Sequence, residues 1–138
     1  MELDMDIIEG IVAGNPRFLS AYDYTEPYFI WDEPGAGHTE PDEAFIARYY
    51  DKLRYAAEHA DELIDLAFRE EFFELYGRDR TKVKDCDDMR SRLIFDSFSM
   101  SAQKGVVNTF LSNSDFMPGH FIEVFWTEDW QVDMYRSC

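Results

Sequence analysis

The sequence is short of positive charge. Its 138 residues include 13 lysines and arginines against 29 aspartates and glutamates, which gives a formal net charge of −16 at pH 7. Proteins that bind DNA or RNA through the phosphates need a basic surface, and anionic membranes attract basic segments. We therefore expect the partner of this chain to be neither a nucleic acid nor a membrane.

Long apolar runs and cysteines are also scarce. The apolar runs extend over a few residues, whereas a membrane-spanning helix needs roughly 20. The first residues lack the basic stretch and apolar stretch of an export signal, so we expect a cytoplasmic location. Cys86 and Cys138 are too few for a disulfide framework or a zinc site. Acidic neighbours of Cys86 are expected to raise the pKa of its thiol and make it a poor nucleophile.

Recognisable motifs for catalysis, phosphate binding and metal binding are missing. Gly35 and Gly37 are followed by His38 and three carboxylates, which have the wrong charge for a phosphate loop. His38 and His120 each lie near acidic residues, but without the spacing typical of metal ligands. We therefore expect no catalytic residue, no metal and no cofactor.

The chain has enough apolar material for one domain spanning residues 1–138, since 46% of it is hydrophobic and 17% aromatic. β-Branched and aromatic segments at both ends predict strands, and an apolar stripe at spacings of three and four predicts central helices. The stripe is too long for one helix in a compact domain, so we expect a break near residues 59–61, with Asp61 capping the second helix. The predicted strands cover residues 6–13, 17–22, 28–31, 93–101, 106–111, 121–126 and 130–135, and the predicted helices cover residues 40–58 and 61–76.

This order, β-β-β-α-α-β-β-β-β, predicts an α+β fold in which two central helices pack on one face of an antiparallel sheet. The polar stretch from residue 78 onward is expected to be a loop followed by a short helix beginning at Asp87. Hairpin turns are expected at residues 103–105 and 127–129.

The negative charge is concentrated towards the amino terminus. Residues 1–43 contain eleven acidic residues and one base, Arg17, whereas residues 44–92 total −2 and residues 93–138 total −4. Tyrosine and tryptophan alternate with acids in residues 22–33 and again in residues 126–130. Rings supply buried area in an interface and acids supply steering towards a lysine- or arginine-rich partner. Alternatively, the rings face the core and the acids face water, which we expect for Phe29, Phe121 and Phe125. The predicted partner-binding surface consists of Asp23, Tyr24, Glu26, Trp31, Asp32, Glu33, Glu40, Asp42 and Glu43.

Residues 115–124 read Asp-Phe-Met-Pro-Gly-His-Phe-Ile-Glu-Val, an acidic turn and a Gly-His pair leading into a strand. This segment resembles the closing part of small bacterial immunity-like domains of polymorphic toxin and contact-dependent inhibition systems. The final hairpin departs from that pattern, because Glu128, Asp129 and Trp130 stand where an Asp-Gly turn is expected. The resemblance implies an α+β fold and a role in toxin inhibition, and it implies no catalytic residues.

Charge and resemblance together predict a non-enzymatic inhibitor that binds a basic protein, most plausibly an immunity protein for a nuclease-type toxin. Two alternatives remain open. One is a phage- or plasmid-encoded DNA mimic that blocks a host nucleic-acid-binding protein. The other is a small hydrolase or ligand-binding domain that uses the region of His38 or His120.

Overall fold

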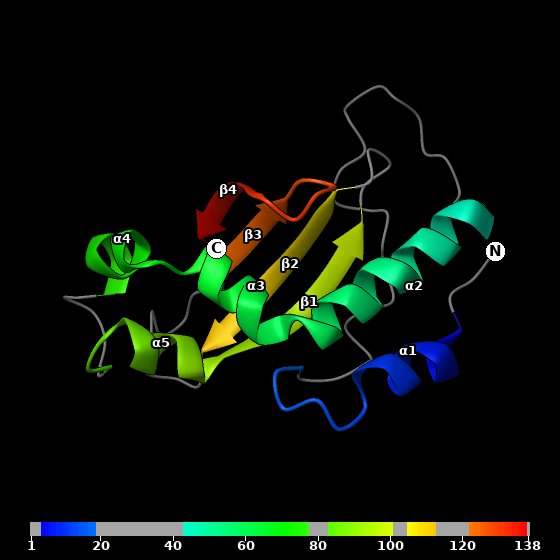
Figure 1. Ribbon diagram of the computed structural model, residues 1–138, viewed down its shortest axis with the longest axis horizontal. Coiled ribbons are helices and arrows are strands. Elements are labelled where there is room, and N and C mark those ends of the chain that lie inside the picture. The colour runs from blue at the N-terminus through cyan, green and yellow to red at the C-terminus, as the bar shows by residue number, and fades with distance from the viewer. Residues whose placement is uncertain (1–3, 19–42, 78–82, 101–104, 113–121, 138) are drawn as a thin grey trace.

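A computed structural model describes residues 4–18, 43–77, 83–100, 105–112 and 122–137. This part of the chain has the α+β architecture expected from the sequence, with helices first and a sheet after them (Figure 1). The helical elements are α1 (Met5–Val12), α2 (Glu43–Glu58), α3 (Ala60–Ala67), α4 (Glu70–Phe72), the π-helical turn η2 (Phe73–Gly77) and α5 (Cys86–Arg92). The strands are β1 (Leu93–Met100), β2 (Val106–Ser112), β3 (Ile122–Trp126) and β4 (Val132–Ser137).

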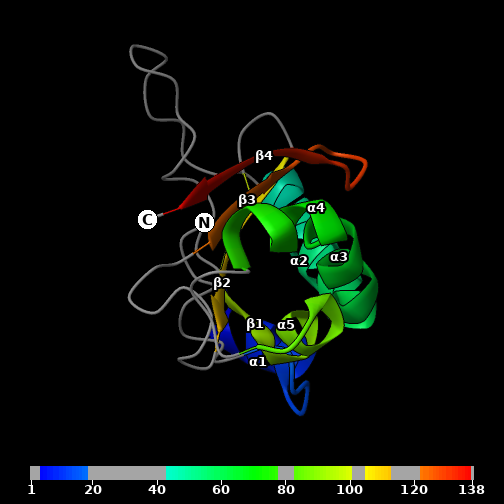
Figure 2. The same cartoon turned by 90° about the vertical axis from the view of Figure 1, so that its left-hand side faces the viewer.

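The four strands form an antiparallel sheet in the order β1-β2-β3-β4, so each strand pairs with its neighbour in sequence. The predicted antiparallel pairings of β1 with β2 and of β3 with β4 are confirmed, and residues 103 and 104 of the first predicted turn lie outside the described residues. In the second hairpin, the amide of Thr127 donates to the carbonyl of Gln131 at 2.8 Å. Figure 2 shows helices α2, α3 and α4 gathered on one side of the sheet. The described residues contain more helices than the two central helices and the short helix near Asp87 that the sequence predicts.

The core lies between α2, α3 and the facing side of the sheet. Tyr49 and Leu53 of α2 and Ile64 of α3 are fully buried, as the apolar stripe predicts. The Tyr49 hydroxyl donates a hydrogen bond to the Phe98 carbonyl of β1 at 3.1 Å, and the two rings pack edge to face at 5.8 Å. The polar group of this buried tyrosine is therefore satisfied by the sheet that its ring covers.

The predicted strand at residues 6–13 is wrong, because this segment forms helix α1. The Asp4 carboxylate accepts a hydrogen bond from the Asp6 amide at 2.9 Å and caps the helix, while Ile8 and Val12, four residues apart, are buried. This spacing places both side chains on one helical face, so their burial favours a helix although the β-branched composition favours a strand. Gly14 follows the helix with φ +74°, a conformation that glycine adopts without strain.

The other two predicted amino-terminal strands lie largely or wholly outside the described residues. Within the segment predicted at 17–22, the structure describes Arg17 and Phe18, and Phe18 forms an isolated parallel bridge to Phe95. The rings of Phe18 and Phe95 stack at 4.6 Å. The strand predicted at 28–31 lies outside the described residues.

The break between the central helices is confirmed, but Asp61 does not cap the second one. His59 occupies the capping position, but its side chain does not cap the helix and its Nδ1 lies 3.0 Å from the Tyr55 carbonyl oxygen instead. The second helix also ends earlier than predicted, at Ala67. The Phe68 carbonyl accepts hydrogen bonds from Arg90 Nε at 2.6 Å and from Cys86 Sγ at 3.5 Å, so it is bound to α5. The chain restarts in α4 and η2, and the predicted short helix near Asp87 is confirmed as α5.

Within the described ranges, no helix is both long enough and apolar enough to cross a membrane.

Helix α5 is held at its start by two aspartates. Asp85 caps it by accepting from the Asp88 amide at 2.8 Å. The Asp88 carboxylate accepts from the Lys84 amide at 2.9 Å and from the Arg92 guanidinium at 3.2 Å. The hydrogen bond from the Lys84 amide, followed by that from Arg92, lowers the pKa of Asp88 below its ordinary value of 3.8.

Replacing Asp88 with asparagine is expected to lower the free energy of unfolding at pH 7. Because the pKa of Asp88 is lowered by folding, its stabilisation is complete above the unfolded pKa and disappears as the pH falls through the folded value. Urea unfolding of both proteins at pH 7 and at successively lower pH measures this difference, with Glu9→Gln as the control for loss of one exposed charge. A difference that stays constant across the acidic range would contradict the assignment.

Candidate functional site

The predicted partner-binding surface lies almost entirely outside the residues that the structure describes. Asp23, Tyr24, Glu26, Trp31, Asp32, Glu33, Glu40 and Asp42 belong to segment 19–42. Glu43, the ninth residue of the set, is the first residue of α2 and is exposed. The proposed convergence of these nine side chains therefore stays a prediction.

A different acidic surface is visible along the helices. We call it the acidic ridge, and it consists of the exposed residues Glu58, Asp61, Glu62, Asp65, Glu70, Glu71 and Glu74. They come from the end of α2, from α3, from α4 and from η2. Arg69 is the only lysine or arginine between positions 58 and 74, so this segment carries a net charge of −6.

Local helix structure explains where four of these acids lie. Asp61 and Glu62 occupy the first turn of α3, and Glu70 and Glu71 occupy the first turn of α4. The free amides at a helix start carry partial positive charge and favour carboxylates there. The break after Ala67 creates the second of these helix starts. The ridge thus combines two acidic helix starts, with further carboxylates at Glu58, Asp65 and Glu74.

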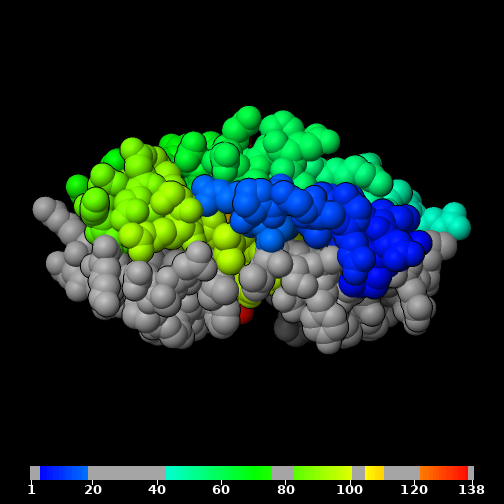
Figure 3. Space-filling model, turned by 90° about the horizontal axis from the view of Figure 1, so that it is seen from below, coloured from blue at the N-terminus to red at the C-terminus, as the bar shows by residue number. Residues whose placement is uncertain are grey.

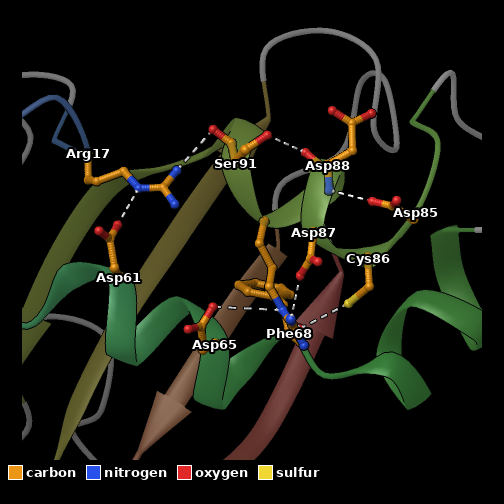
Figure 4. Close-up of polar contacts among 10 residues, drawn as sticks. Arg17, Asp61, Asp65, Phe68, Asp85, Cys86, Asp87, Asp88 and Ser91 are labelled. Carbon is orange, nitrogen blue, oxygen red and sulfur yellow. Dashed lines mark hydrogen bonds and ion pairs between the residues drawn. The ribbon is translucent and has the colours of Figure 1, made fainter.

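Two arginines, Arg17 and Arg90, contact carboxylates of the ridge, and Figure 4 shows Arg17 beside Asp61. Arg17 Nε lies 2.8 Å from Asp61 Oδ1, and Arg17 Nη1 donates to the carbonyls of Ser91 and Leu93 at 3.0 and 2.9 Å. Arg90 Nε lies 3.9 Å from Asp65 Oδ1.

The two pairs are asymmetric in exposure. The side chains of Arg17 and Arg90 are 19% and 21% exposed, whereas those of Asp61 and Asp65 are 81% and 66% exposed. Arg17 also donates to two backbone carbonyls and Arg90 to one, so both arginines connect separate segments of the fold while the carboxylates remain exposed to solvent. Because both carboxylates are largely solvated, each ion pair contributes at most about 1 kcal/mol.

The other five ridge acids form no ion pair with any residue in the described ranges: Glu58, Glu62, Glu70, Glu71 and Glu74. Carboxylates without an ion-pair partner repel one another and raise the negative potential in front of the helices. Repulsion of this kind favours binding of a cation-bearing partner. The ridge is therefore the part of the described surface best suited to attract positive charge.

Beside the ridge lies an open groove of about 740 Å³ between the α3–α4 segment and β4. Leu66, Phe72 and Leu75 line it on the helical side, and Val132 and Tyr135 line it on the sheet side. Leu75 is 76% exposed and Leu66 is 42% exposed. The groove thus presents apolar surface directly next to carboxylates. The sequence predicts this combination of apolar and acidic side chains for a different segment, residues 22–33.

The aromatic pair near the carboxy terminus belongs to the core. Trp126 is 1% exposed and its Nε1 donates to Asn108 Oδ1 at 2.5 Å. Trp130 is 9% exposed and stacks on Tyr55 at 5.0 Å, with Lys52 Nζ 5.5 Å from its ring. The prediction that alternation at 126–130 marks an interface is therefore wrong for both tryptophans. Phe125, expected to face the core, is half-buried.

Cys86 and His59, the one cysteine and the one histidine among the described residues, both make contacts within the fold. Cys86 is 1% exposed, and burial is the largest cause of its raised pKa, with Glu70, Asp87 and Asp85 adding to it. The direction predicted from its acidic neighbours is confirmed, although Arg90 opposes it. His59 stacks on Tyr55 at 4.1 Å. Among the described positions, no three histidine, cysteine or acidic side chains are grouped to hold a metal, and His38 and His120 lie outside those positions.

The sequence matches no protein-family model, and comparisons with curated proteins and with solved structures find no match either. Ile122, Glu123 and Val124 form part of β3. Residues 115–121 lie outside the described ranges. The acidic ridge and its groove therefore supply the structural argument for function.

Proposed function

We propose that this chain is a non-enzymatic binding protein that neutralises a cationic protein, and that it acts as an immunity protein against a nuclease-type toxin. The observation that carries this proposal is the acidic ridge, in which seven exposed carboxylates face one exposed base, Arg69. The net charge of −16 supports it, because the field of the whole chain has the same sign as the ridge.

The chemistry of a nuclease explains the choice of partner. An enzyme that grips nucleic acid displays lysine and arginine towards the phosphates, and that surface attracts carboxylates equally well. Opposite surface potentials accelerate association, and rate constants of about 10⁸–10⁹ M⁻¹s⁻¹ are reached at low salt. An inhibitor that must intercept a toxin before it reaches nucleic acid benefits from this speed.

The groove adds what charge alone lacks. Exposed ion pairs contribute little to affinity, whereas apolar side chains buried at the centre of an interface contribute most of it. Leu66 and Leu75 line the same groove as Glu71, so one partner segment can contact both kinds of surface. Steering by the ridge would speed association, and burial of apolar side chains in the groove would slow dissociation.

Affinity capture tests this function. The immobilised chain is exposed at low salt to a lysate of its source organism, and the retained proteins are identified by mass spectrometry and assayed for nucleic-acid cleavage. We expect a basic nuclease that elutes with salt and whose cleavage activity is abolished by one equivalent of the chain. Retention only of neutral or acidic proteins, or a captured nuclease that stays active in the complex, would contradict the proposal.

A further inference from the structure

Strand β4 forms an edge of the sheet. It pairs with β3 on one side, and the sheet order places no strand beyond it within the described residues. Asp133, Met134, Tyr135 and Arg136 are all exposed. An exposed edge carries backbone amides and carbonyls that can pair with an added strand.

The edge runs along the groove, so an added strand would lie against apolar surface. The Tyr135 ring packs 5.3 Å from the Phe72 ring, and its hydroxyl donates to the Ala67 carbonyl, which fixes the groove wall. Leu66 and Leu75 stand across from it with large exposed fractions. In strand addition, main-chain hydrogen bonds supply affinity and pockets for alternate side chains supply specificity.

Charge determines what kind of strand fits. Glu71 and Asp133 line the groove, Glu70 and Glu74 are exposed on the same short helical segment, and Arg69 is the one base lining it among the described residues. A second copy of the chain would bring another −16 to this surface, so self-pairing along β4 is opposed at neutral pH. A strand that alternates apolar residues with lysine or arginine suits both the groove and its acids.

We infer that the cationic partner contributes an extended, basic segment that pairs with β4 as a fifth strand and places its apolar side chains in the groove of Leu66, Leu75 and Tyr135. This inference rests on the proposed function for the charge of the partner. It adds the conformation of the bound segment, the edge to which it bonds and the groove that it fills. The ridge then steers the partner, and β4 sets the register of the complex.

A synthetic peptide tests the inference without the natural partner. The probe is a capped peptide of about nine residues that alternates valine and lysine, mixed with the intact chain at low salt. We expect binding with a dissociation constant below about 1 mM and slowing of backbone amide exchange in residues 132–137 by about five-fold or more. Two further peptides carry N-methyl groups on alternate amides, one peptide on the valine amides and the other on the lysine amides. A strand forms hydrogen bonds to a sheet edge through one of these two sets only. We therefore expect one of the two peptides to bind about ten-fold more weakly than the other.

Variants of the chain locate the groove. Leu75→Gln should weaken the peptide several-fold, whereas Ile7→Gln, the same kind of change at a 39% exposed position on α1, should not. A dissociation constant above about 1 mM, equal binding of the two N-methylated peptides, or protection elsewhere than in β4 overturns strand addition. A free chain that already sediments as a dimer with β4 protected also overturns it.

The same experiment separates failure of the inference from failure of the proposed function. A matched peptide with glutamate in place of lysine should bind far more weakly. If the lysine peptide is preferred but protection appears on α3 and α4, strand addition fails and cationic selectivity stands. If both peptides protect β4 equally, the edge is a docking site and the proposed charge selectivity fails.

Discussion

Replacing Phe68 with alanine is expected to lower the free energy of unfolding by about 3–5 kcal/mol. The Phe68 side chain is fully buried, and its ring contacts Phe72 and Phe110, each at 4.9 Å between ring centres. Removing the ring leaves a cavity between the α3–α4 segment and β2, and the walls are held by two separate layers that cannot close together freely. Domains of this size have total stabilities of about 5–15 kcal/mol, so the loss is a large fraction.

Urea or thermal unfolding measures this effect. Leu75→Ala is the matched control, since it truncates a large apolar side chain of the same segment that is 76% exposed and should change stability by about 0.5 kcal/mol or less. Equal losses from the two substitutions would mean that Phe68 does not join the two layers as described.

Reversing two charges of the acidic ridge should disable partner binding. The variant Glu62→Lys with Glu74→Lys changes two exposed carboxylates that form no ion pair within the described structure. It places lysines where the partner presents its own, and like charges juxtaposed across an interface cost several kcal/mol. We expect the dissociation constant of the captured partner to rise on the order of 100-fold or more at low salt.

A charge-matched variant serves as the control. Asp6→Lys with Glu9→Lys also reverses two exposed acids, one of them in a first helical turn, so both double variants carry a net charge of −12. These residues lie on α1, whose surface is dark blue in Figure 3. A loss of partner affinity in the α1 variant as large as that in the ridge variant would indicate that overall charge, and not the ridge, governs binding.

The carboxy-terminal half of the fold was predictable because local and tertiary signals agree there. Hydrophobic alternation and turn residues defined β1 to β4, and no competing interaction changed them. Residues 6–13 show the opposite case. Their β-branched composition favours a strand, but the Asp4 cap and the paired burial of Ile8 and Val12 stabilise a helix. The end of α3 at Ala67 was also hidden, since it depends on Arg90 and Cys86 binding the Phe68 carbonyl from far along the chain.

The acidic ridge was missed from the sequence because the charge was summed over too long a segment. Residues 44–92 total −2, because the basic residues at 48–54 and 78–92 cancel the acids between them. Summing the charge over residues 58–74 alone, a segment about the length of one or two helices, gives −6. The groove had no such signal, since it forms only where β4 comes beside α3 and α4 in the fold.

The salt dependence of association with the captured partner is the most direct test of an acidic surface that steers a cationic protein. Stopped-flow measurements between about 0.02 M and 0.5 M salt would follow the association rate constant as the Debye length shortens to a few ångströms. We predict a decrease of about 100-fold or more for the natural chain and a much shallower decrease for the Glu62→Lys, Glu74→Lys variant. An association rate that is independent of salt in the natural chain would contradict the central claim.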